Sequence, residues 1–551
     1  MTSHAHTSAP ARTAPLEGLA LVAIWAICTI VNLGKAAHID DTAHLEIARW
    51  IQHAPLHPMQ GLVDWEGRSA PIAELNQPHL FFYLIAGLGL LTGDLLLAGQ
   101  IWVAVFLAVG LVSFHALWRR VVGPRGAVLG ATVLFVGPAF LPGQNAMTDA
   151  PLVCLWILFL YLLVRGDGRG RWWIAAALVV AIATLVKYTS LALIPVLAID
   201  VLSRGREHRR HLAVLAVPVG ALTLWSIFNV LDYGGVHLLE RPVGASSLLA
   251  SLGGSIGRAL LFVIALGGVV PFAIAALPLV PRRALAIAVA VIIVGAIGTQ
   301  VAALFVPDIA GESVVTSAAR VVFLVVGVVL VGRLAIEARP AVHDALRGRP
   351  LDEGGRHTLI LASCALAGTA FVIVLAPFMA VRHVLLVLPA ILLLLARAYA
   401  SRLEAHRAWI AASVVTTVLL GLALGISDRR WAQTYRAIAE AHAHDAPRVI
   451  FVGHWGWQWH AAEAGMIRYE AGVTELASGD VVIRPHLISQ PQLSPEDAAR
   501  LVAGEPIVIA PGVLDRLRTM TPRYGYYLVG AELPWSVSDA PVEVFDVSTV
   551  R

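Results

Sequence analysis

The fold is set by an apolar run followed by a charged loop near the start of the chain. Residues 16–34 read LEGLALVAIWAICTIVNLG, and residues 35–79 read KAAHIDDTAHLEIARWIQHAPLHPMQGLVDWEGRSAPIAELNQPH. The first stretch is close to the ~20 apolar residues that a helix needs to cross a bilayer. The second places an acidic pair, Asp40-Asp41, a few residues beyond that helix, where carboxylates are costly to hold near lipid. We therefore interpret residues 35–79 as the first outer loop and as part of a polar site.

The overall composition is that of a membrane protein. Of the 551 residues, 58% are hydrophobic and 14% are charged, whereas globular domains carry roughly 25% charged residues. The mean hydropathy is +0.76. The formal net charge of +4 is small and gives no indication of a nucleic-acid partner. Cys28, Cys154 and Cys364 all lie inside apolar runs, which favours small core residues over disulfides or a metal set.

Apolar runs recur as far as residue 426 and predict a polytopic α-helical protein with about thirteen transmembrane spans. This count requires that the apolar region 78–118 crosses only once, with Pro78–Leu91 as a re-entrant or tilted segment. The run at 16–34 lacks a small-residue cleavage site and is expected to be a retained helix. From residue 427 the pattern changes to short β-branched runs between polar stretches, which predicts a small soluble α/β domain over 427–551.

The arginines predict how the chain is oriented. Arginine clusters occur at 119–125, 165–171, 204–210, 282–283, 333–356 and 402–407. Short cytoplasmic loops are enriched in Lys and Arg, so we place these clusters inside. The other ends of the spans then lie together outside, and they carry Asp40-Asp41, Asp149, Lys187 and Arg382. The 427–551 domain also falls on this outer side.

The acidic candidates each have two interpretations. Asp40-Asp41 begins a segment, Asp41–Gln52, whose mixed polar and apolar residues predict a short helix along the membrane interface. The pair is either a general base or cation-binding site, or an ordinary helix cap. Asp149, in the turn MTDAP before an apolar span, poses the same choice, with Pro151 in the first turn. Their shared predicted side of the membrane favours the functional interpretation.

The basic candidates are Lys187-Tyr188 and Arg382-His383, and each pair interrupts two apolar runs. Such a cation either extends to the membrane surface or binds a phosphate. Arginine suits bidentate phosphate contact in particular. The sequence alone leaves both interpretations open.

Two further stretches stand out. The loop 231–255 carries Asp232, His237, Glu240 and Arg241 among glycines and serines, and it is either a lid or a plain surface loop. The stretch HWGWQWH at 454–460 holds three tryptophans and two histidines. Metal binding by these histidines is weakly supported because no third ligand is evident nearby. Stacking on a sugar and an ordinary core contact both remain open.

Several of these stretches, taken in order, resemble the GT-C glycosyltransferases. The closest resemblance is to bacterial relatives of the protein O-mannosyltransferases and the lipid A aminoarabinose transferases (glycosyltransferase family 39 type). The similar segments are Asp40-Asp41-Thr42-Ala43-His44, Asn76-Gln77-Pro78-His79-Leu80, Thr148-Asp149-Ala150-Pro151, Lys187-Tyr188 and Arg382-His383. Two positions depart from the family pattern: its acidic-Lys pair is Asn76-Gln77 here, and the Tyr after its late Arg is His383.

The resemblance implies a membrane transferase that moves a hexosyl or pentosyl group from a polyprenyl-phosphate donor to a lipid, glycan or protein acceptor. It also implies a multi-pass protein that is located in the bacterial cytoplasmic membrane and contacts its lipids. Asp40 would be the base, and Asp41 and Asp149 would orient it. It implies no certain cofactor and leaves a divalent cation open. The substrate-binding residues would be His44, Asn76, Gln77, His79, Lys187, Tyr188, Arg241, Arg382 and His383.

Two other classes of protein stay open. One is a transporter, although transporters tend to place ionisable residues near the membrane midplane and to contain inverted repeats. Here the notable charges gather at one predicted face, and the sequence shows no repeat. The other is a catalytically inactive relative that supports envelope assembly through residues 427–551.

Overall fold

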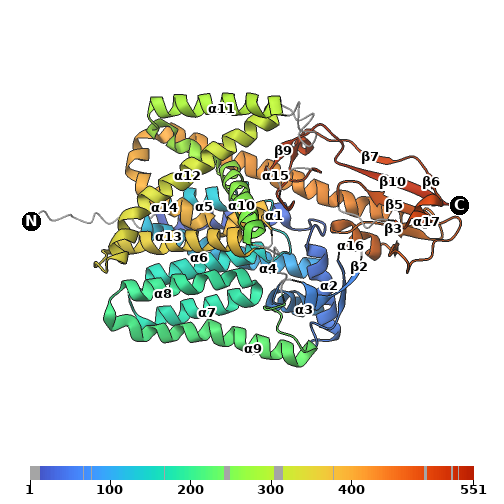
Figure 1. Ribbon diagram of the computed structural model, residues 1–551, viewed down its shortest axis with the longest axis horizontal. Helices are drawn as coiled ribbons and strands as arrows, with labels where there is room; N and C mark the ends of the chain where they lie inside the picture. Colours follow the sequence, from blue (N-terminus) through green and yellow to red (C-terminus); the bar gives the residue numbers. More distant parts are fainter. Residues whose placement is uncertain are drawn as a thin grey trace, which may run out of the picture.

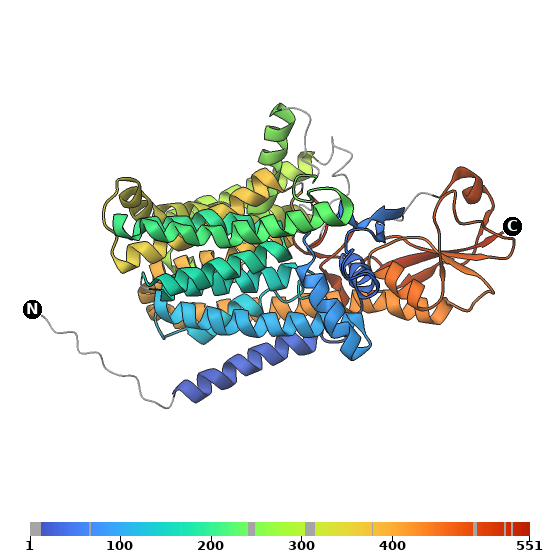
Figure 2. The same ribbon diagram turned by 90° about the horizontal axis from the view of Figure 1, so that it is seen from below.

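A helical bundle and a small α/β region lie end to end along the long axis of the molecule (Figures 1 and 2). The structure is a computed structural model. It describes residues 13–65, 68–75, 77–166, 168–240, 248–302, 314–376, 378–488, 493–522, 525–530 and 533–551. The chain ends in the α/β region, on the side away from the bundle.

The bundle is built from apolar helices that run mostly along the long axis (Figure 2). Among the described residues, seven helices are long and apolar enough to cross a membrane, so the chain is a multi-pass helical membrane protein. The finer count of about thirteen spans stays a prediction. The helices are α1 (Thr13–Asn32), α4 (Leu95–Val121), α5 (Ala127–Phe135), α6 (Asp149–Arg165), α7 (Gly170–Val186), α8 (Leu193–Ser203), α9 (Ala216–Tyr233), α10 (Leu248–Gly268), α11 (Arg282–Ala302), α12 (Val314–Leu346), α13 (Glu353–Ala370), α14 (Leu388–Leu403) and α15 (Arg407–His442).

Two predicted spans have unusual shapes. The segment predicted as re-entrant forms α3 (Leu80–Thr92), a helix of 13 residues that packs against α4. At 1.5 Å per residue it is about 20 Å long, less than the ~30 Å of a hydrocarbon core. The run after α10 does not continue straight: η4 (Pro271–Leu279) turns from α10 by 80°. Proline lacks the backbone N–H that would continue a helix, which accounts for a break at Pro271.

The first outer loop forms α2 (Asp41–His53), the hairpin β1 (Leu62–Trp65) and β2 (Arg68–Pro71), and a short 3-10 turn. The predicted helix is therefore present, but it does not lie free along the membrane interface. It packs against α3 on one side and against α16 (Gly456–Glu463) of the α/β region on another (Figure 1). Eight of its residues are buried, because protein covers more than one of its faces.

The α/β region contains a mixed sheet with the order β4-β3-β5-β10-β6, in which β7 also pairs with β10. Strands β3, β4 and β5 are parallel, and β10 is antiparallel to β5, β6 and β7. Helix α15 runs without a break across residues 426–427 and leads into the sheet. The division of the chain into domains at that point stays a prediction. The strands are β3 (Val449–Phe451), β4 (Ile467–Arg468), β5 (Val481–Pro485), β6 (Leu501–Ala503), β7 (Ile507–Ile509) and β10 (Glu543–Val550).

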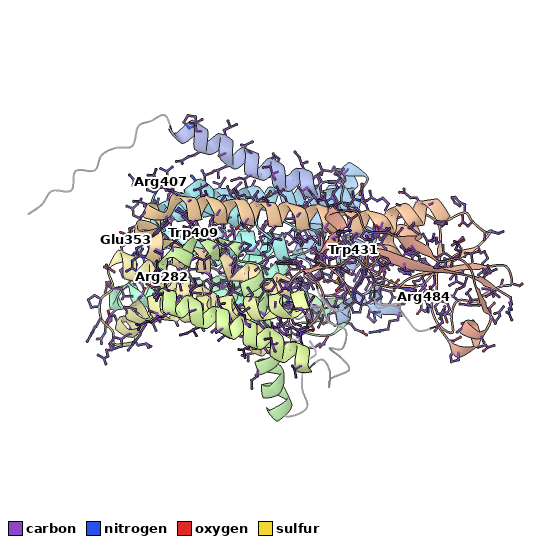
Figure 3. All side chains as sticks on the ribbon, turned by 90° about the horizontal axis from the view of Figure 1, so that it is seen from above. Arg282, Glu353, Arg407, Trp409, Trp431 and Arg484 are labelled. Atoms are coloured by element: carbon purple, nitrogen blue, oxygen red, sulfur yellow. The ribbon has the colours of Figure 1, made fainter. Side chains whose placement is uncertain are left out.

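The two ends of the bundle differ in the residues they carry. Figure 3 shows Arg282, Glu353 and Arg407 at the end away from the α/β region, whereas Trp431 lies toward that region. The arginine clusters represented by Arg282 and Arg407 therefore share one end, as the orientation rule requires. The loops at the opposite end hold the charged residues described next.

Candidate functional site

Four charged side chains from distant parts of the sequence meet where the bundle adjoins the α/β region. Arg382 Nη2 donates to Asp40 Oδ2 at 3.0 Å, and Lys187 Nζ donates to Asp149 Oδ1 at 2.8 Å. The two pairs are joined because Arg382 Nε lies 3.6 Å from Asp149 Oδ2. We call these four residues the acid–base cluster. It contains two carboxylates and two cations, so its formal charges balance.

Each member of the acid–base cluster stands at the end of a helix. Asp40 is the residue before α2, and Asp149 is the first residue of α6. Lys187 lies in an extended link after α7, and Arg382 lies in η7 (Val381–Leu386), before α14. Helix ends bring four segments to one level of the bundle, and this is why residues so far apart in sequence can touch.

The acid–base cluster is largely shielded from solvent. The exposed side-chain fractions are 17% for Asp40 and Lys187, 9% for Asp149 and 8% for Arg382. Charges in such surroundings are retained when they are paired, and their attraction is stronger than in water. Arg382 still has unused donors, because its Nε and Nη1 atoms have no hydrogen-bond partner within the described residues. A guanidinium offers five N–H donors, so this side chain can bind a further anion.

Asp41 directly follows Asp40, and its side chain bonds to the loop before α2. Its Oδ2 atom accepts a hydrogen bond from the backbone N–H of His38 at 3.2 Å. Burial raises the pKa of the Asp41 carboxyl well above its usual range. The contact is of the local side-chain-to-backbone kind that shapes the start of a helix.

His44 and Gln77 connect α2 to the segment before Asp149. His44 Nδ1 lies 3.2 Å from the carbonyl oxygen of Ala146, and Gln77 Nε2 lies 3.2 Å from His44 Nε2. Thr148 donates its hydroxyl to Gln77 Oε1 at 2.7 Å. Burial lowers the pKa of His44 to about 4, so the ring is neutral at pH 7, with Nδ1 protonated and Nε2 accepting. This chain of contacts fixes α2 relative to the start of α6.

A second cluster of rings stands apart from the acid–base cluster. The Tyr188 hydroxyl lies 3.0 Å from His237 Nδ1 and accepts a hydrogen bond from Trp225 Nε1 at 3.0 Å. The ring of His79 is centred 5.8 Å from that of Trp225, and it is fully buried. Tyr188 and His79 thus belong to one group of rings, in which both lie near Trp225 and His237.

The remaining predicted residues have different outcomes. His383 uses Nδ1 to accept a hydrogen bond from the backbone N–H of Ala380 at 3.2 Å, and burial lowers its pKa to about 3. Asn76 and Arg241 lie outside the described residues.

Within the part of the chain that the structure describes, no group of three or more His, Cys, Asp or Glu side chains is arranged to hold a metal ion. The described residues therefore define no site for the divalent cation that the resemblance leaves open.

A second buried ion pair lies close by, and no sequence motif predicted the pairing of its members. Lys35 Nζ donates to Asp428 Oδ2, which also accepts a hydrogen bond from the hydroxyl of Tyr527 at 3.0 Å. Thr519 donates its hydroxyl to Asp428 Oδ1. His38 Nε2 lies 3.5 Å from the same oxygen. We call this the Asp428 network. It ties the start of the first outer loop to α15 and to the α/β region.

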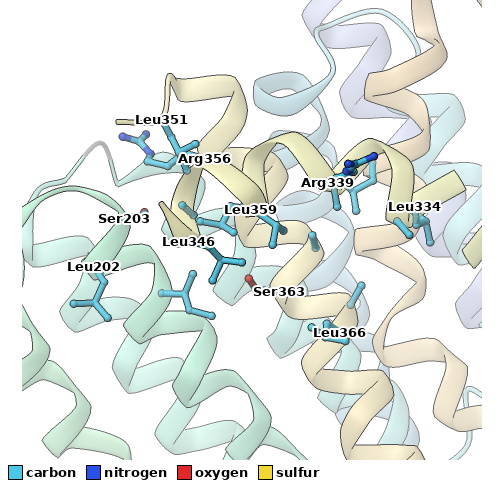
Figure 4. Close-up of a pocket in the computed structure, with 18 of the residues that line it drawn as sticks. Leu202, Ser203, Leu334, Arg339, Leu346, Leu351, Arg356, Leu359, Ser363 and Leu366 are labelled. Atoms are coloured by element: carbon cyan, nitrogen blue, oxygen red, sulfur yellow. The ribbon is translucent and has the colours of Figure 1, made fainter. Parts of the chain in front are cut away.

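A large cavity of about 1330 Å³ opens between α8, α10, α12, α13 and α14 (Figure 4). It is lined mainly by aliphatic side chains such as Leu202, Leu334, Leu359 and Leu366, with Arg339, Arg349 and Arg356 along part of its wall. The lining follows α13 from Arg356 to Thr369 and continues to Ile373. Among the described residues, none of those predicted for the site lines this cavity.

Comparison with known proteins gives one family. Residues 76–230 match the family model described as "Dolichyl-phosphate-mannose-protein mannosyltransferase". This range contains Gln77, His79, Asp149 and Lys187 but neither Asp40 nor Arg382. Over these residues, less than a third of the chain, the match agrees with the resemblance to the protein O-mannosyltransferases. No curated protein matches the chain.

Solved structures show a distant likeness. The oligosaccharyltransferase of Archaeoglobus fulgidus, determined with Zn and sulfate, is 13% identical with a TM-score of 0.46; the match covers 82% of this chain and 62% of that one. ArnT from Cupriavidus metallidurans in the apo state is 13% identical with a TM-score of 0.45, over 97% and 98% of the two chains. The arabinofuranosyltransferase AftD from Mycobacteria is 14% identical with a TM-score of 0.36, over 98% and 40%. At these TM-scores no residue role or ligand is carried over.

Proposed function

We propose that this chain is a membrane glycosyltransferase that moves a sugar from a polyprenyl-phosphate donor to an acceptor hydroxyl on a lipid, glycan or protein. The observation that carries this proposal is the convergence of Asp40, Asp149, Lys187 and Arg382 from four separate segments. The donor class agrees with the description of the family matched by residues 76–230, which names a dolichyl-phosphate sugar. No observation favours a transporter or an inactive scaffold over this function.

The two cations would bind the phosphate of the donor. Arg382 presents Nε and Nη1 without hydrogen-bond partners among the described residues, and Lys187 is 17% exposed beside it. When the bond between the sugar and the phosphate breaks, negative charge grows on the phosphate oxygens. Fixed cations in a shielded site stabilise that charge more than water does. Asp149 contacts both cations, so its role would be to hold them in place.

Asp40 would act as the general base. It is more exposed than Asp149, and among the described residues the cation paired with it is Arg382. The acceptor O–H would give its proton to Asp40 while the oxygen bonds to the anomeric carbon and the polyprenyl phosphate leaves. A single displacement of this kind inverts the configuration at that carbon. Asp41, whose carboxylate accepts from the backbone N–H of His38, would keep the loop that carries Asp40 in place.

The cavity between α8 and α13 would hold the prenyl chain of the donor. Its lining is largely aliphatic, and along α13 it extends from Arg356 to Ile373. Seventeen residue steps of helix correspond to about 26 Å, which is long enough for several prenyl units. The end of the cavity at Ile373 lies nine residues before Arg382 in sequence. A prenyl chain bound in this cavity would therefore bring the phosphate of the donor toward the acid–base cluster.

The acid–base cluster would face the outside of a bacterial cytoplasmic membrane. Arg282 and Arg407 lie at the end of the bundle away from the α/β region (Figure 3), and arginine-rich loops are typical of the cytoplasmic side. The α/β region and the cluster would then both lie on the outer side. A polyprenyl-phosphate sugar presented at that surface could reach both.

The test is sugar transfer by the purified full-length protein in proteoliposomes. The donors are undecaprenyl- and dolichyl-phosphate carrying mannose, glucose, arabinose or aminoarabinose, each offered with hydroxyl-bearing lipid, glycan and peptide acceptors. We expect transfer from at least one donor and its loss in Asp40→Asn, with insertion and thermal stability retained. Full transfer by Asp40→Asn would remove Asp40 as the base. Solute flux without any glycosyl transfer would replace the proposed function by transport.

A further inference from the structure

The tryptophan- and histidine-rich stretch at 454–460 lies directly against the loop that carries Asp40. Gly456 is packed so closely that an added Cβ would lie 2.4 Å from the carbonyl oxygen of Ala37 and 3.4 Å from Cα of His38. Helix α16, which begins at Gly456, also contacts α2. A residue of the α/β region, His454, is thereby brought to the segment that ends in Asp40.

The backbone is strained on both sides of this contact. Among the described residues, only two non-glycine residues have a positive φ: Ile39 at 52° and Trp455 at 57°. One immediately precedes Asp40 and the other immediately follows His454. Such conformations are unfavourable for side chains with a Cβ and gather at functional sites.

His454 is buried without a hydrogen-bond partner. It is 3% exposed, and neither ring nitrogen has a partner within the described part of the chain. A buried, unpaired polar group is costly, and its presence calls for an explanation. Burial lowers the pKa of His454 to about 4, while the charge of Asp40 acts in the opposite direction. The ring is therefore neutral at pH 7, with one N–H to donate and one nitrogen to accept, close enough to sense Asp40.

His460, at the other end of the stretch, makes a useful comparison. It is also a buried histidine, and its Nε2 atom has no partner among the described residues. The charged residue that acts on it is Arg436, not Asp40. The two histidines thus share type and burial but differ in their relation to Asp40.

We propose that His454 is a further residue of the transfer site and hydrogen-bonds the attacking hydroxyl of the acceptor beside Asp40. This inference rests on the proposed function. The hydroxyl proton passes to Asp40, and His454 stays neutral, holding the oxygen in line with the anomeric carbon. The acceptor is a hydroxyl-bearing group, or water in its place, that enters between the bundle and the α/β region. The α/β region therefore supplies part of the site.

The experiment measures hydrolysis by the full-length protein in proteoliposomes, with water as the acceptor. The probe is undecaprenyl phosphate carrying mannose, glucose, arabinose or aminoarabinose, and release of free sugar is followed. The variants are His454→Ala, His454→Gln, His454→Asn and the control His460→Gln. Glutamine places an amide nitrogen near Nε2 and asparagine near Nδ1. We expect His454→Ala to lower the maximal rate at least 100-fold with the half-saturating donor concentration unchanged within twofold.

One of the two amide variants should recover at least a tenth of the wild-type rate, which identifies the working nitrogen, and His460→Gln should match wild type within twofold. A structural role would lower the melting temperature of all the His454 variants without separating the rates of the Gln and Asn forms. If wild type releases sugar and the His454→Gln, His454→Asn and wild-type rates agree within twofold, the inference is wrong and the proposed function stands. If wild type neither transfers nor releases any sugar of the panel, both are wrong.

Discussion

Two buried ion pairs lie near each other at the same end of the bundle, and they differ in what they leave available. In the Asp428 network, three donors reach the carboxylate, from Lys35, Tyr527 and Thr519, and the carboxylate is closed off from solvent. In the acid–base cluster, Arg382 keeps unused N–H donors, and Asp40 and Lys187 are partly exposed. A saturated network holds segments together, whereas an unsaturated one can still bind a ligand. The first is suited to structure and the second to chemistry.

The sharpest way to break this contrast is to change Arg382. Arg382→Gln removes the cation that bridges Asp40 and Asp149, and Arg382→Lys keeps a charge without the planar fork. We expect Arg382→Gln to lower sugar transfer by about 10²–10³-fold, as loss of one preorganised donor does. Arg382→Lys should keep less than a tenth of the activity. Transfer rates and melting temperatures of both variants provide the measurement.

Equal activity of Arg382→Lys and wild type would contradict the bridging role, because a lysine cannot reach both carboxylates in the same way. Loss of folding in Arg382→Gln alone would show that the acid–base cluster is needed for structure. The contrast with the Asp428 network would then be wrong.

The Asp428 network should respond in the opposite way. Asp428→Asn leaves Lys35 as a buried cation without its counter-charge. Breaking a buried pair by removing one partner costs about 3–5 kcal/mol of folding free energy. We therefore expect a large fall in thermal stability in detergent, with the transfer rate per folded molecule within a few-fold of wild type. An Asp428→Asn protein that is fully stable but inactive would place this network in the chemistry instead.

The sequence could predict the acid–base cluster because its information is local. Arginine-rich loops identify one side of the membrane, and that assignment leaves Asp40, Asp149, Lys187 and Arg382 on the other side. Their contacts in the structure agree with that placement. Their chemical roles stay predictions.

The Asp428 network could not be predicted in the same way. Asp428 and Lys35 are 393 residues apart, and Asp428 is followed by two arginines at the end of an apolar run. Such a carboxylate has obvious partners on its own helix, and only the packing of α15 against the first outer loop turns it toward Lys35. The role proposed for His454 was equally hidden. Its stretch is conspicuous in sequence, but only tertiary packing brings it near Asp40.

A smaller effect is expected from the contacts that link α2 to α6. Thr148→Val keeps the shape of the side chain and removes the hydroxyl that donates to Gln77. Gln77 then loses one anchor for its contact with His44. A hydrogen bond of this kind contributes about 1 kcal/mol, so we expect a transfer rate roughly three- to tenfold below wild type. Thr148→Ser, which restores the hydroxyl, should recover most of the rate. If Thr148→Val transfers sugar as fast as Thr148→Ser, the contact between Thr148 and Gln77 does not contribute to activity.

The smallest effect concerns the pH dependence of stability and a group on α2 that belongs to neither ion pair. Burial raises the pKa of Glu46 from 4.5 to about 7, although Gln458 and the backbone N–H of Asp64 donate to its carboxylate. The folded protein therefore binds a proton at Glu46 that the unfolded chain releases near pH 4.5. The stability contributed by this protonated carboxyl is present below pH 4.5 and is lost as the pH rises through 7. Glu46→Gln cannot ionise, so its melting temperature should exceed that of wild type at pH 8 and approach it at pH 5. If the difference in melting temperature between the two proteins is constant from pH 5 to pH 8, Glu46 is ionised throughout this range in the folded protein. The contact between α2 and α16 would then involve a charged carboxylate rather than a neutral carboxyl group.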